Sequence, residues 1–293
     1  MPHPSAANTA PTVSTWLATA TAALQNASIP SARLDAEVIL AHTIRKPRTY
    51  LHAHGDEPLD SRQQEIANAR IDLRLDRVPI AYIIGHKEFY GRRFKVTTAT
   101  LIPRPESEVL IELLNETLAT MSTQMPLVTN EPLRLLDVGT GSGALGITAK
   151  LEHPELASQL DVTLIDTSRH ALAVAKDNAT ILHADVDTVQ SDLLTSYPLT
   201  ATIIMANLPY VDPSWQRSPE TDHEPAEALF ADNHGLALIY KLIAQTKEKL
   251  IQGGTLILEA DPTQHELIKT EATRYGLVLV TQKEYGLAFN KVT

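Results

Sequence analysis

The sequence predicts an α/β protein with a mostly parallel sheet, preceded by a small all-α domain and a linking β-hairpin. Two observations carry this prediction. From residue 133 onward, short apolar segments alternate with segments of helical periodicity, and such alternation is typical of a parallel sheet covered by helices on both faces. Before Pro79, apolar residues recur instead at spacings of three and four, which indicates amphipathic helices. With 293 residues and 43% hydrophobic content, the chain can form two unequal domains.

A helical domain is predicted over residues 1–85. Its three helices are expected at residues 12–27, 31–44 and 59–77. Pro30 and Pro58 stand just before the second and third helices, where a proline is tolerated because the first N–H groups of a helix have no partner within it. His52 and His54 fall in a predicted loop, and this isolated pair does not predict a metal site.

The second domain, residues 86–293, begins with a hairpin. Aromatic and β-branched residues flank Gly91, which is typical of two short strands joined by a turn. A helix is expected from Glu106. Seven strands then follow, predicted at LRLLDV, DVTLID, the residues before Ser191, ATIIMA, GTLILEA, LVLVTQ and LAFNKV. The last two leave no room for a helix between them, so the final strand is expected to run antiparallel.

Composition excludes several classes of function. The absence of cysteine removes disulfides, thiolate catalysis and cysteine-based zinc sites, and it fits the cytoplasm, where we expect the protein. No apolar stretch is long enough to span a membrane and the start of the chain does not resemble a signal peptide, so we expect no membrane association. Residues 1–95 hold 12 Lys and Arg against 9 Asp and Glu, whereas residues 96–293 hold 13 against 26. Because proteins that bind nucleic acids normally present a basic surface, we expect no stable nucleic-acid binding.

A glycine-rich turn directly follows the strand LRLLDV and directly precedes a helix. The turn reads DVGTGSG, and its candidate cofactor-binding residues are Asp137, Gly139, Thr140, Gly141 and Gly143. Glycines at such a place let the backbone approach a ligand closely and direct the N–H groups of the following helix toward it. A tight turn without a ligand is the alternative. Asp166 ends the next strand, where a carboxylate can accept hydrogen bonds from the ribose hydroxyls of a nucleoside.

Two details favour S-adenosylmethionine over a nicotinamide cofactor. The glycine spacing is G-x-G-x-G, whereas dinucleotide-binding loops have G-x-G-x-x-G. Ser191-Asp192 follows the third strand, and a carboxylate there can accept a hydrogen bond from the adenine amino group. For Asp192 the alternative is a helix N-cap.

The segment Asn207-Leu208-Pro209-Tyr210 follows the strand ATIIMA and indicates the reaction. An amide nitrogen is a poor nucleophile because its lone pair is spread into the carbonyl group. The Asn207 side-chain oxygen and the Leu208 carbonyl can each hold one N–H and turn the lone pair toward an activated methyl group, which is catalysis by positioning and electrostatics. Pro209 would stiffen the loop, and the Tyr210 ring would pack on the planar group. The alternative is an Asx-type turn with a structural proline.

On these residues the sequence resembles the release factor glutamine methyltransferase family, enzymes that N5-methylate the glutamine of a Gly-Gly-Gln tripeptide. ARLDAEVILAH at residues 32–42 is similar to that family's helical domain, and PIAYIIGHKEFYGRRFKV with LIPRPESE is similar to its linker. DVGTGSGALGI and the Asn-x-Pro-Tyr loop are similar to its catalytic domain. LIPRPESE discriminates best, because methyltransferases in general lack it.

The resemblance implies a Rossmann-like class I methyltransferase fold with a seven-stranded sheet and S-adenosylmethionine as cofactor. It implies peptide chain release factors as protein substrates, held by the helical domain. It also implies that Arg104, Pro105 and Glu106 lie near the cofactor or substrate, although a capped helix start would equally explain Pro105 and Glu106. Glu224-Pro225 either closes the substrate side or forms a surface turn. Asn207 counts among the cofactor-binding candidates as well.

Leu208 is a departure, because the family usually has proline there and because Asn-Leu-Pro-Tyr also resembles the ribosomal-RNA adenine dimethylases. We expect activity to survive, since this residue contributes only its backbone carbonyl. An adenine-N6 methyltransferase acting on rRNA or DNA is the alternative function, against which the acidic charge and LIPRPESE argue. A non-catalytic S-adenosylmethionine-binding protein would be expected to lack Asn207 or the glycines. Nothing resembles a coiled coil, so we expect a monomer.

Overall fold

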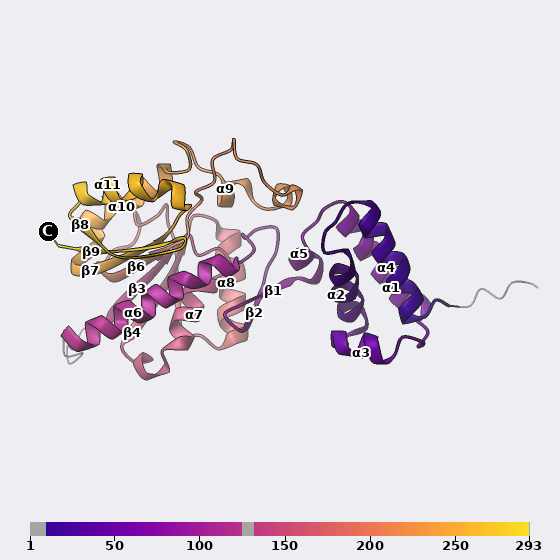
Figure 1. Cartoon of the computed structure of the whole chain (residues 1–293). Helices are drawn as coiled ribbons and strands as arrows, with labels where there is room; N and C mark the ends of the chain where they lie inside the picture. Colours follow the sequence, from indigo (N-terminus) through magenta and orange to yellow (C-terminus); the bar gives the residue numbers. More distant parts are fainter. Residues whose placement is uncertain (1–9, 125–131, 293) are drawn as a thin grey trace, which may run out of the picture. The chain divides into compact units, whose positions relative to one another are not determined.

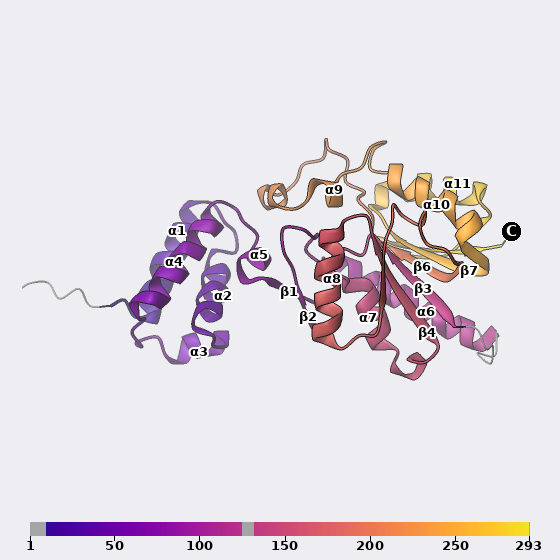
Figure 2. The same cartoon turned by 180° about the vertical axis from the view of Figure 1, so that it is seen from behind.

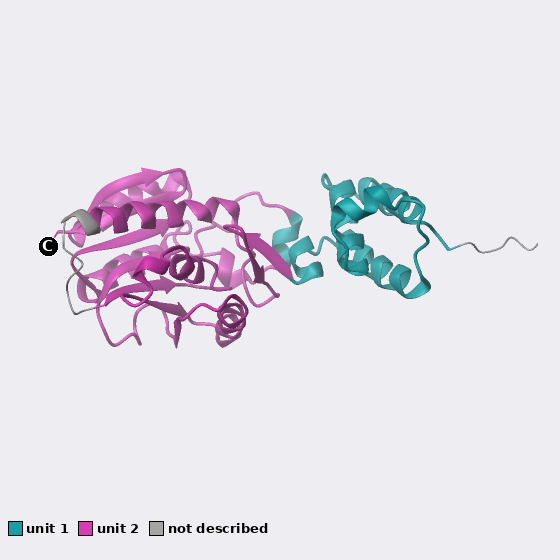
Figure 3. Cartoon of the chain, turned by 90° about the horizontal axis from the view of Figure 1, so that it is seen from below, with its two compact units in different colours: residues 1–85, 219–223 teal, residues 86–218, 224–293 magenta. Residues whose placement is uncertain are grey.

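The computed structural model describes residues 10–124 and 132–292, and the chain folds into two compact units (Figure 3). The first unit contains the chain up to Gly85 together with Pro219–His223, and the second contains His86–Ser218 and Glu224–Thr293. A short segment from the second half of the sequence therefore belongs to the helical unit. Apolar clusters form the interior of each unit, as expected of units that fold around their own cores.

The N-terminal part of the first unit is helical. Within residues 10–85 the α-helices are α1 (Val13–Asn26), α2 (Ala32–Ile44), α3 (Arg48–Ala53), α4 (Ser61–Leu75) and α5 (Ile80–Ile84). Helices α1, α2 and α4 confirm the three predicted ones. Helices α3 and α5 were not predicted, because six and five residues are too few to display helical periodicity. His52 lies in α3 and His54 is its C-cap, so the expectation that both occupy a loop is wrong.

Capping residues explain where two of these helices begin. The Thr12 side chain accepts a hydrogen bond from the backbone N–H of Thr15 at the start of α1. Asp60 and Gln63 form a capping box at the start of α4, in which each side chain accepts a hydrogen bond from the other residue's backbone. The buried faces of the helices share a core whose members include Trp16, Leu17, Leu24, Ile39 and Leu40.

The 3₁₀ helix η3 (Pro219–His223) is bound to this unit by charged groups. Glu220 Oε1 accepts hydrogen bonds from Arg74 Nη2 at 3.0 Å and from Arg77 Nη1 at 3.4 Å. The Arg74 side chain is buried and also donates from Nε to Asp35 Oδ2 at 2.8 Å. Since Asp35 lies in α2 and Arg74 in α4, one arginine connects three elements of the unit.

The second unit begins with the predicted hairpin, formed by β1 (His86–Phe89) and β2 (Arg92–Lys95). Tyr90 and Gly91 form its two-residue turn with φ of 48° and 72°. Positive φ at both positions defines the type I′ turn, whose twist matches that of paired strands. The prediction of a hairpin around Gly91 is therefore confirmed.

A seven-stranded sheet forms the centre of this unit (Figures 1 and 2). Its strands are β3 (Leu133–Val138), β4 (Leu160–Asp166), β5 (Asp187–Gln190), β6 (Ala201–Ala206), β7 (Leu250–Glu259), β8 (Leu277–Lys283) and β9 (Gly286–Lys291). They stand in the order β5-β4-β3-β6-β7-β9-β8. Strand β9 pairs antiparallel with both β7 and β8, and the other pairs are parallel. The predicted mostly parallel sheet with an antiparallel last strand is confirmed.

Helices cover both faces of the sheet (Figure 1). One face carries α6 (Glu108–Gln124), α7 (Ala144–Glu152) and α8 (Arg169–Leu182), and the other carries α10 (Ala237–Lys249) and α11 (His265–Arg274). Leu135 and Leu136 of β3 pack into these two cores respectively, because successive strand residues point to opposite faces. The shorter elements are η1 (Pro105–Ser107), η2 (Pro154–Leu156), α9 (Ala226–Leu229) and η4 (Pro262–Gln264). No helix among the described residues is long and apolar enough to cross a membrane.

Candidate active site

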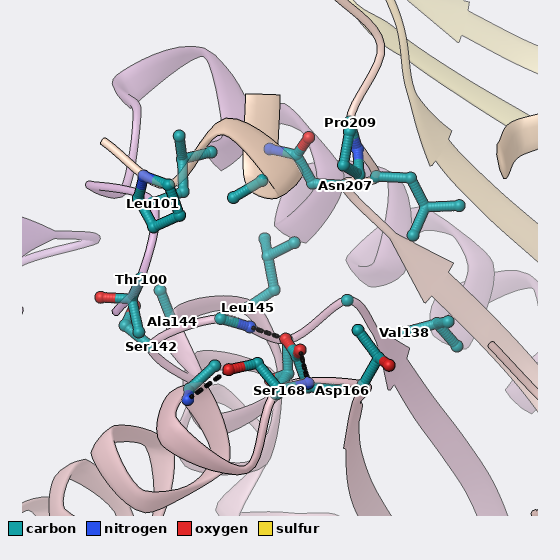
Figure 4. Close-up of a pocket in the computed structure, with 18 of the residues that line it drawn as sticks. Thr100, Leu101, Val138, Ser142, Ala144, Leu145, Asp166, Ser168, Asn207 and Pro209 are labelled. Atoms are coloured by element: carbon teal, nitrogen blue, oxygen red, sulfur yellow. Dashed lines mark hydrogen bonds between the residues drawn. The ribbon is translucent and has the colours of Figure 1, made fainter. Parts of the chain in front are cut away.

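A cavity opens at the carboxyl edge of the sheet, where the loops after β3, β4, β5 and β6 meet (Figure 4). The strand order reverses beside β3, so the neighbouring loops diverge and leave a crevice. The cavity encloses about 1090 Å³, its open mouth included. Its lining consists of Phe89, Leu238 and residues from the segments 99–107, 138–145, 166–171, 191–193, 207–209 and 225–228. In Figure 4, Asn207 and Asp166 lie on different sides of the open space.

The glycine-rich loop lies against the end of β4. The backbone N–H groups of Gly139 and Thr140 donate to the Ile165 carbonyl oxygen at 2.8 and 2.9 Å, and the Gly141 N–H donates to Asp166 Oδ2 at 2.9 Å. Gly139 and Gly141 have φ of 74° and 54°, left-handed values that favour glycine. The three loop residues and Asp166 all line the cavity, so four predicted residues meet at one place.

Two further residues of the predicted set lie behind this loop instead of on the cavity. Asp137 is fully buried, and its Oδ2 accepts from Thr140 Oγ1 at 2.6 Å and from the Gly146 N–H at 2.8 Å. Burial raises the pKa of Asp137 to about 6. Gly143 caps α7, and a Cβ there would lie 3.3 Å from Ala175 Cβ. Both residues therefore shape the loop and its packing on the next helix.

The two predicted acidic residues at strand ends both line the cavity. Asp166 accepts hydrogen bonds from Gly141 and, at 2.8 Å, from the Ser168 N–H, and burial raises its pKa. Asp192 is more exposed, and its carboxylate pairs with Lys241 Nζ at 2.5 Å. Residues 191–200 are all described and contain no helix, so the helix N-cap alternative for Asp192 does not apply.

The first three residues of the Asn-Leu-Pro-Tyr segment line the cavity. Asn207 Nδ2 donates to Ser107 Oγ at 2.9 Å. Leu208 is buried, and its Cδ2 lies 2.9 Å from the position of a Cβ added to Gly139. The segment and the glycine-rich loop are thus in direct contact, which places Asn207 beside the cofactor-binding candidates.

Tyr210 lies behind the cavity. Its hydroxyl donates to Glu259 Oε1 at 3.0 Å, and burial raises its pKa. Its carbonyl oxygen accepts from Gln264 Nε2 at 2.8 Å, and its ring packs against the apolar core. This arrangement gives Tyr210 a bracing position and does not support the expected packing of its ring on a substrate group.

The LIPRPESE segment contributes four residues to the lining, namely Leu101, Pro103, Arg104 and Ser107. Arg104 lines the cavity and donates from Nη2 to the buried Glu224 carboxylate, which also accepts from the Ile102 N–H at 3.0 Å. Glu106 is exposed and lies outside the lining, because the 3₁₀ turn of η1 directs Ser107 inward instead. Of the two alternatives for Glu224, closure beside the cavity agrees with its burial and a surface turn does not.

Among the residues that were not singled out from the sequence are Ser107 and Leu193, which line the cavity, and Glu259, which lies outside the lining. Ser107 stands within LIPRPESE, and Leu193 follows Asp192 with φ of 48°. Glu259 is buried at the end of β7, where burial raises its pKa. A signal existed for Glu259, because a carboxylate at the end of an apolar parallel strand points to the same edge as Asp166.

A methyltransferase that uses S-adenosylmethionine is the class of protein that this fold and cavity define. A model of the methyltransferase small domain matches residues 112–224, and a model of the PrmC N-terminal domain matches residues 15–85. The chain is 35% identical to the release factor glutamine methyltransferase of Deinococcus radiodurans over 89% of this chain and 90% of that one. It is 32% identical to that of Escherichia coli over 92% and 94% of the two chains. The chain belongs to the release factor glutamine methyltransferase family.

Similarity to solved structures is lower. A methyltransferase from Pyrococcus furiosus aligns with a TM-score of 0.49 and 18% identity, over 77% of this chain and 98% of that one.

Proposed function

We propose that this enzyme transfers a methyl group from S-adenosylmethionine to the side-chain amide nitrogen, N5, of the glutamine in the Gly-Gly-Gln motif of peptide chain release factors. The observation that carries the proposal is that Asn207, Leu208 and Pro209 line the same cavity as the glycine-rich loop and Asp166. The names of the relatives supply the substrate class.

The residues around the cavity fit S-adenosylmethionine. A Cβ at Gly141 would meet no atom within 4 Å, so this glycine borders open space in which a ligand can lie against the backbone. Asp166 is the acceptor for ribose hydroxyls, and the Asp192 region is the adenine side. When bound, S-adenosylmethionine supplies a methyl group on a positively charged sulfur. Asp166 and Asp192 also supply negative charge that favours a cationic ligand.

Asn207 and Leu208 supply positioning. The Asn207 side-chain oxygen and the Leu208 backbone carbonyl each accept one N–H of the glutamine carboxamide. With both hydrogens held, the nitrogen lone pair is directed out of conjugation and toward the methyl group. The methylated nitrogen then releases one of its two protons to solvent, and because that cationic nitrogen is acidic, no strong base is required. Pro209 limits the motion of the loop because its ring fixes φ. Leucine at position 208 retains the required acceptor, since the carbonyl belongs to the backbone.

An extended peptide loop is favoured over a nucleobase as the substrate. Residues 96–293 hold 13 Lys and Arg against 26 Asp and Glu, and such a surface repels the phosphates of RNA or DNA. The relatives are named for a protein substrate. The adenine-N6 alternative is therefore not favoured.

The helical unit, which the PrmC N-terminal domain model matches, is proposed to bind the release factor. Its Lys and Arg side chains would steer a partner that carries negative charge. We further propose that the enzyme works as a cytoplasmic monomer and holds no nucleic acid stably. Sedimentation of the protein alone, and then with added rRNA, tests both statements, because a dimer or a comigrating RNA would contradict them.

The test of the proposed function is competition between substrates. The protein is incubated with S-adenosylmethionine labelled in its methyl group, a release factor and ribosomal RNA together. Label on the release factor supports the proposal, and label on the RNA alone contradicts it. Replacement Asn207→Ala is expected to leave cofactor affinity by calorimetry nearly intact and to lower turnover by about two orders of magnitude or more. Undiminished turnover would remove Asn207 from the mechanism.

A further inference from the structure

Asn207 and Glu259 are neighbours across two parallel strands. In the register of β6 and β7, Ala206 pairs with Leu258, so Asn207, which directly follows β6, lies beside Glu259, the last residue of β7. Glu259 is 1% exposed, and no part of the proposed reaction uses it. A buried carboxylate beside a catalytic amide requires an explanation, because burying a charge is unfavourable unless neighbouring groups compensate.

Ser107 is hydrogen bonded to Asn207 and lies near Glu259. Its residue is 4% exposed, and its Oγ accepts the hydrogen bond from Asn207 Nδ2 at 2.9 Å. Burial raises the pKa of Glu259, whereas its neighbours Ser107, Tyr210 and Asn207 lower it in part. Those three side chains therefore favour the charged carboxylate. Of the two Glu259 oxygens, Oε1 accepts from the Tyr210 hydroxyl at 3.0 Å, and Oε2 is buried without a hydrogen-bond partner among the described residues.

The numbers of hydrogen-bond donors and acceptors on these groups determine whether Asn207 presents its NH2 group or its oxygen to Ser107. An ionised carboxylate only accepts hydrogen bonds, and a serine hydroxyl has one hydrogen and two lone pairs. If the Ser107 hydrogen turns toward the Glu259 carboxylate, only lone pairs remain for Asn207, which must then present its NH2 group. Asn207 Oδ1 is consequently left for the cavity. If the Asn207 amide were turned by 180°, its NH2 group would face the NH2 group of the substrate. Two donors cannot form a hydrogen bond with each other.

We propose that Glu259 and Ser107 are positioning residues, which together hold the Asn207 amide with its oxygen toward the substrate. Glu259 sets the direction, since it accepts only. Ser107 relays this effect to Asn207, since its hydroxyl has a single hydrogen. When that hydrogen is donated to Glu259, the hydroxyl can only accept from Asn207. Tyr210 holds the carboxylate in place from the other side. This inference rests on the proposed function, because it assigns Asn207 Oδ1 the task of accepting a substrate N–H.

The test compares variants in the full-length enzyme, with kcat measured at saturating release factor and S-adenosylmethionine. Ser107→Ala is expected to lower kcat by about tenfold to a hundredfold, the range found when a partner that orients a functional side chain is removed. Ser107→Thr retains the hydroxyl and is expected to stay within about threefold of the wild type on the same grounds. Glu259→Gln places an NH2 donor beside Ser107 and is expected to lower kcat at least as much as Ser107→Ala, because it reverses the hydrogen bonds instead of removing one.

Coupling between the two sites separates this arrangement from a general loss of stability. If Glu259 acts through Ser107, the double variant Ser107→Ala/Glu259→Gln has nearly the kcat of Ser107→Ala alone. Cofactor affinity is expected to remain within about twofold in the single variants, since neither change touches the glycine-rich loop. Thr148→Val removes a buried hydroxyl of α7 and serves as the control, with kcat unchanged.

The outcomes distinguish the two claims. A wild-type enzyme that does not methylate the release factor contradicts the proposed function itself. An active wild type with undiminished kcat in Ser107→Ala or Glu259→Gln contradicts only the positioning roles. Losses that multiply in the double variant, or that Ser107→Thr does not restore, also overturn the inference, because they indicate independent structural damage.

Discussion

Leu208 Cδ2 lies 2.9 Å from the position that a Cβ on Gly139 would occupy. Gly139 belongs to the glycine-rich loop and Leu208 to the segment that contains Asn207. The close packing of these two segments therefore depends on the absence of a side chain at Gly139. Gly141, two residues further along, differs in its surroundings. A Cβ there would meet nothing within 4 Å, because it would point into the open cavity.

Gly139→Ala and Gly141→Ala are therefore predicted to fail in different ways. Both place a side chain at positive φ, which costs about 1 kcal/mol, but only Gly139→Ala also displaces Leu208. We expect the larger loss of unfolding free energy and the larger loss of kcat from Gly139→Ala. Gly141→Ala should keep most of its stability and lose S-adenosylmethionine affinity. Calorimetry and thermal unfolding of both variants check this, and equal stability losses would contradict the assigned contact.

The burial of Asp137 predicts a dependence of stability on pH. Its pKa is about 6 in the folded chain, against an ordinary value of 3.8. Between these values the folded chain keeps a proton that the unfolded chain has lost, so stability falls as pH rises through this window and is level above it. The difference corresponds to about 3 kcal/mol at most.

The isosteric variant Asp137→Asn cannot ionise and isolates this effect. Its unfolding free energy relative to the wild type should increase from pH 4 to pH 6 and then stay constant. Denaturant titrations across that range measure the difference. A constant difference at every pH would show that Asp137 does not titrate as its burial requires.

Glu224 is predicted to hold the loop that lines the cavity opposite the glycines. It accepts from the Ile102 N–H and from Arg104. Glu224→Ala would leave both donors without this partner and is expected to weaken cofactor binding by about tenfold or more, whereas Glu224→Gln keeps an acceptor and should weaken it less. Asp177→Asn, which breaks the exposed pair with Lys95, is the control. Equal affinities in all four proteins would contradict this role.

Arg74 is predicted to stabilise the helical unit through its contacts with Asp35 and Glu220. Its side chain is 6% exposed, and removing one partner of a buried ion pair costs about 3 kcal/mol or more. Arg74→Ala should therefore speed hydrogen exchange of the α2 and α4 amides, while the exposed Arg62→Ala in α4 should not. Unchanged exchange in Arg74→Ala would show that the charged network is energetically neutral.

Much of the fold could be predicted because its signals are local. Six of the seven strands of the sheet coincide with apolar runs, and β5, which reads DTVQ, is the exception. Tyr90-Gly91 makes the hairpin turn, and the long helices show periodicity. The short helices α3 and α5 carry no such signal. The attachment of Pro219–His223 to the helical unit also could not be foreseen, because it depends on Glu220 meeting Arg74, which is distant in the sequence.

The candidate site was predicted for residues whose position follows from a strand end, such as Asp166 and Asn207. The prediction of site residues was less accurate where the geometry of a turn decides which of two adjacent residues faces the cavity. The 3₁₀ turn exposes Glu106 and buries Ser107, although the two are adjacent in one motif. Asp137 and Gly143 belong to the glycine motif but brace it from behind, since only part of a tight loop can border a cavity.

Mass spectrometry of a release factor, after incubation with this enzyme and S-adenosylmethionine, tests the proposed glutamine methylation. One added methyl group is expected on the glutamine of the Gly-Gly-Gln peptide, at the side-chain amide, and about a hundredfold less product in the same time when Asn207→Ala replaces the wild type. A methyl group on another residue, or an unmodified release factor beside methylated RNA, would contradict it.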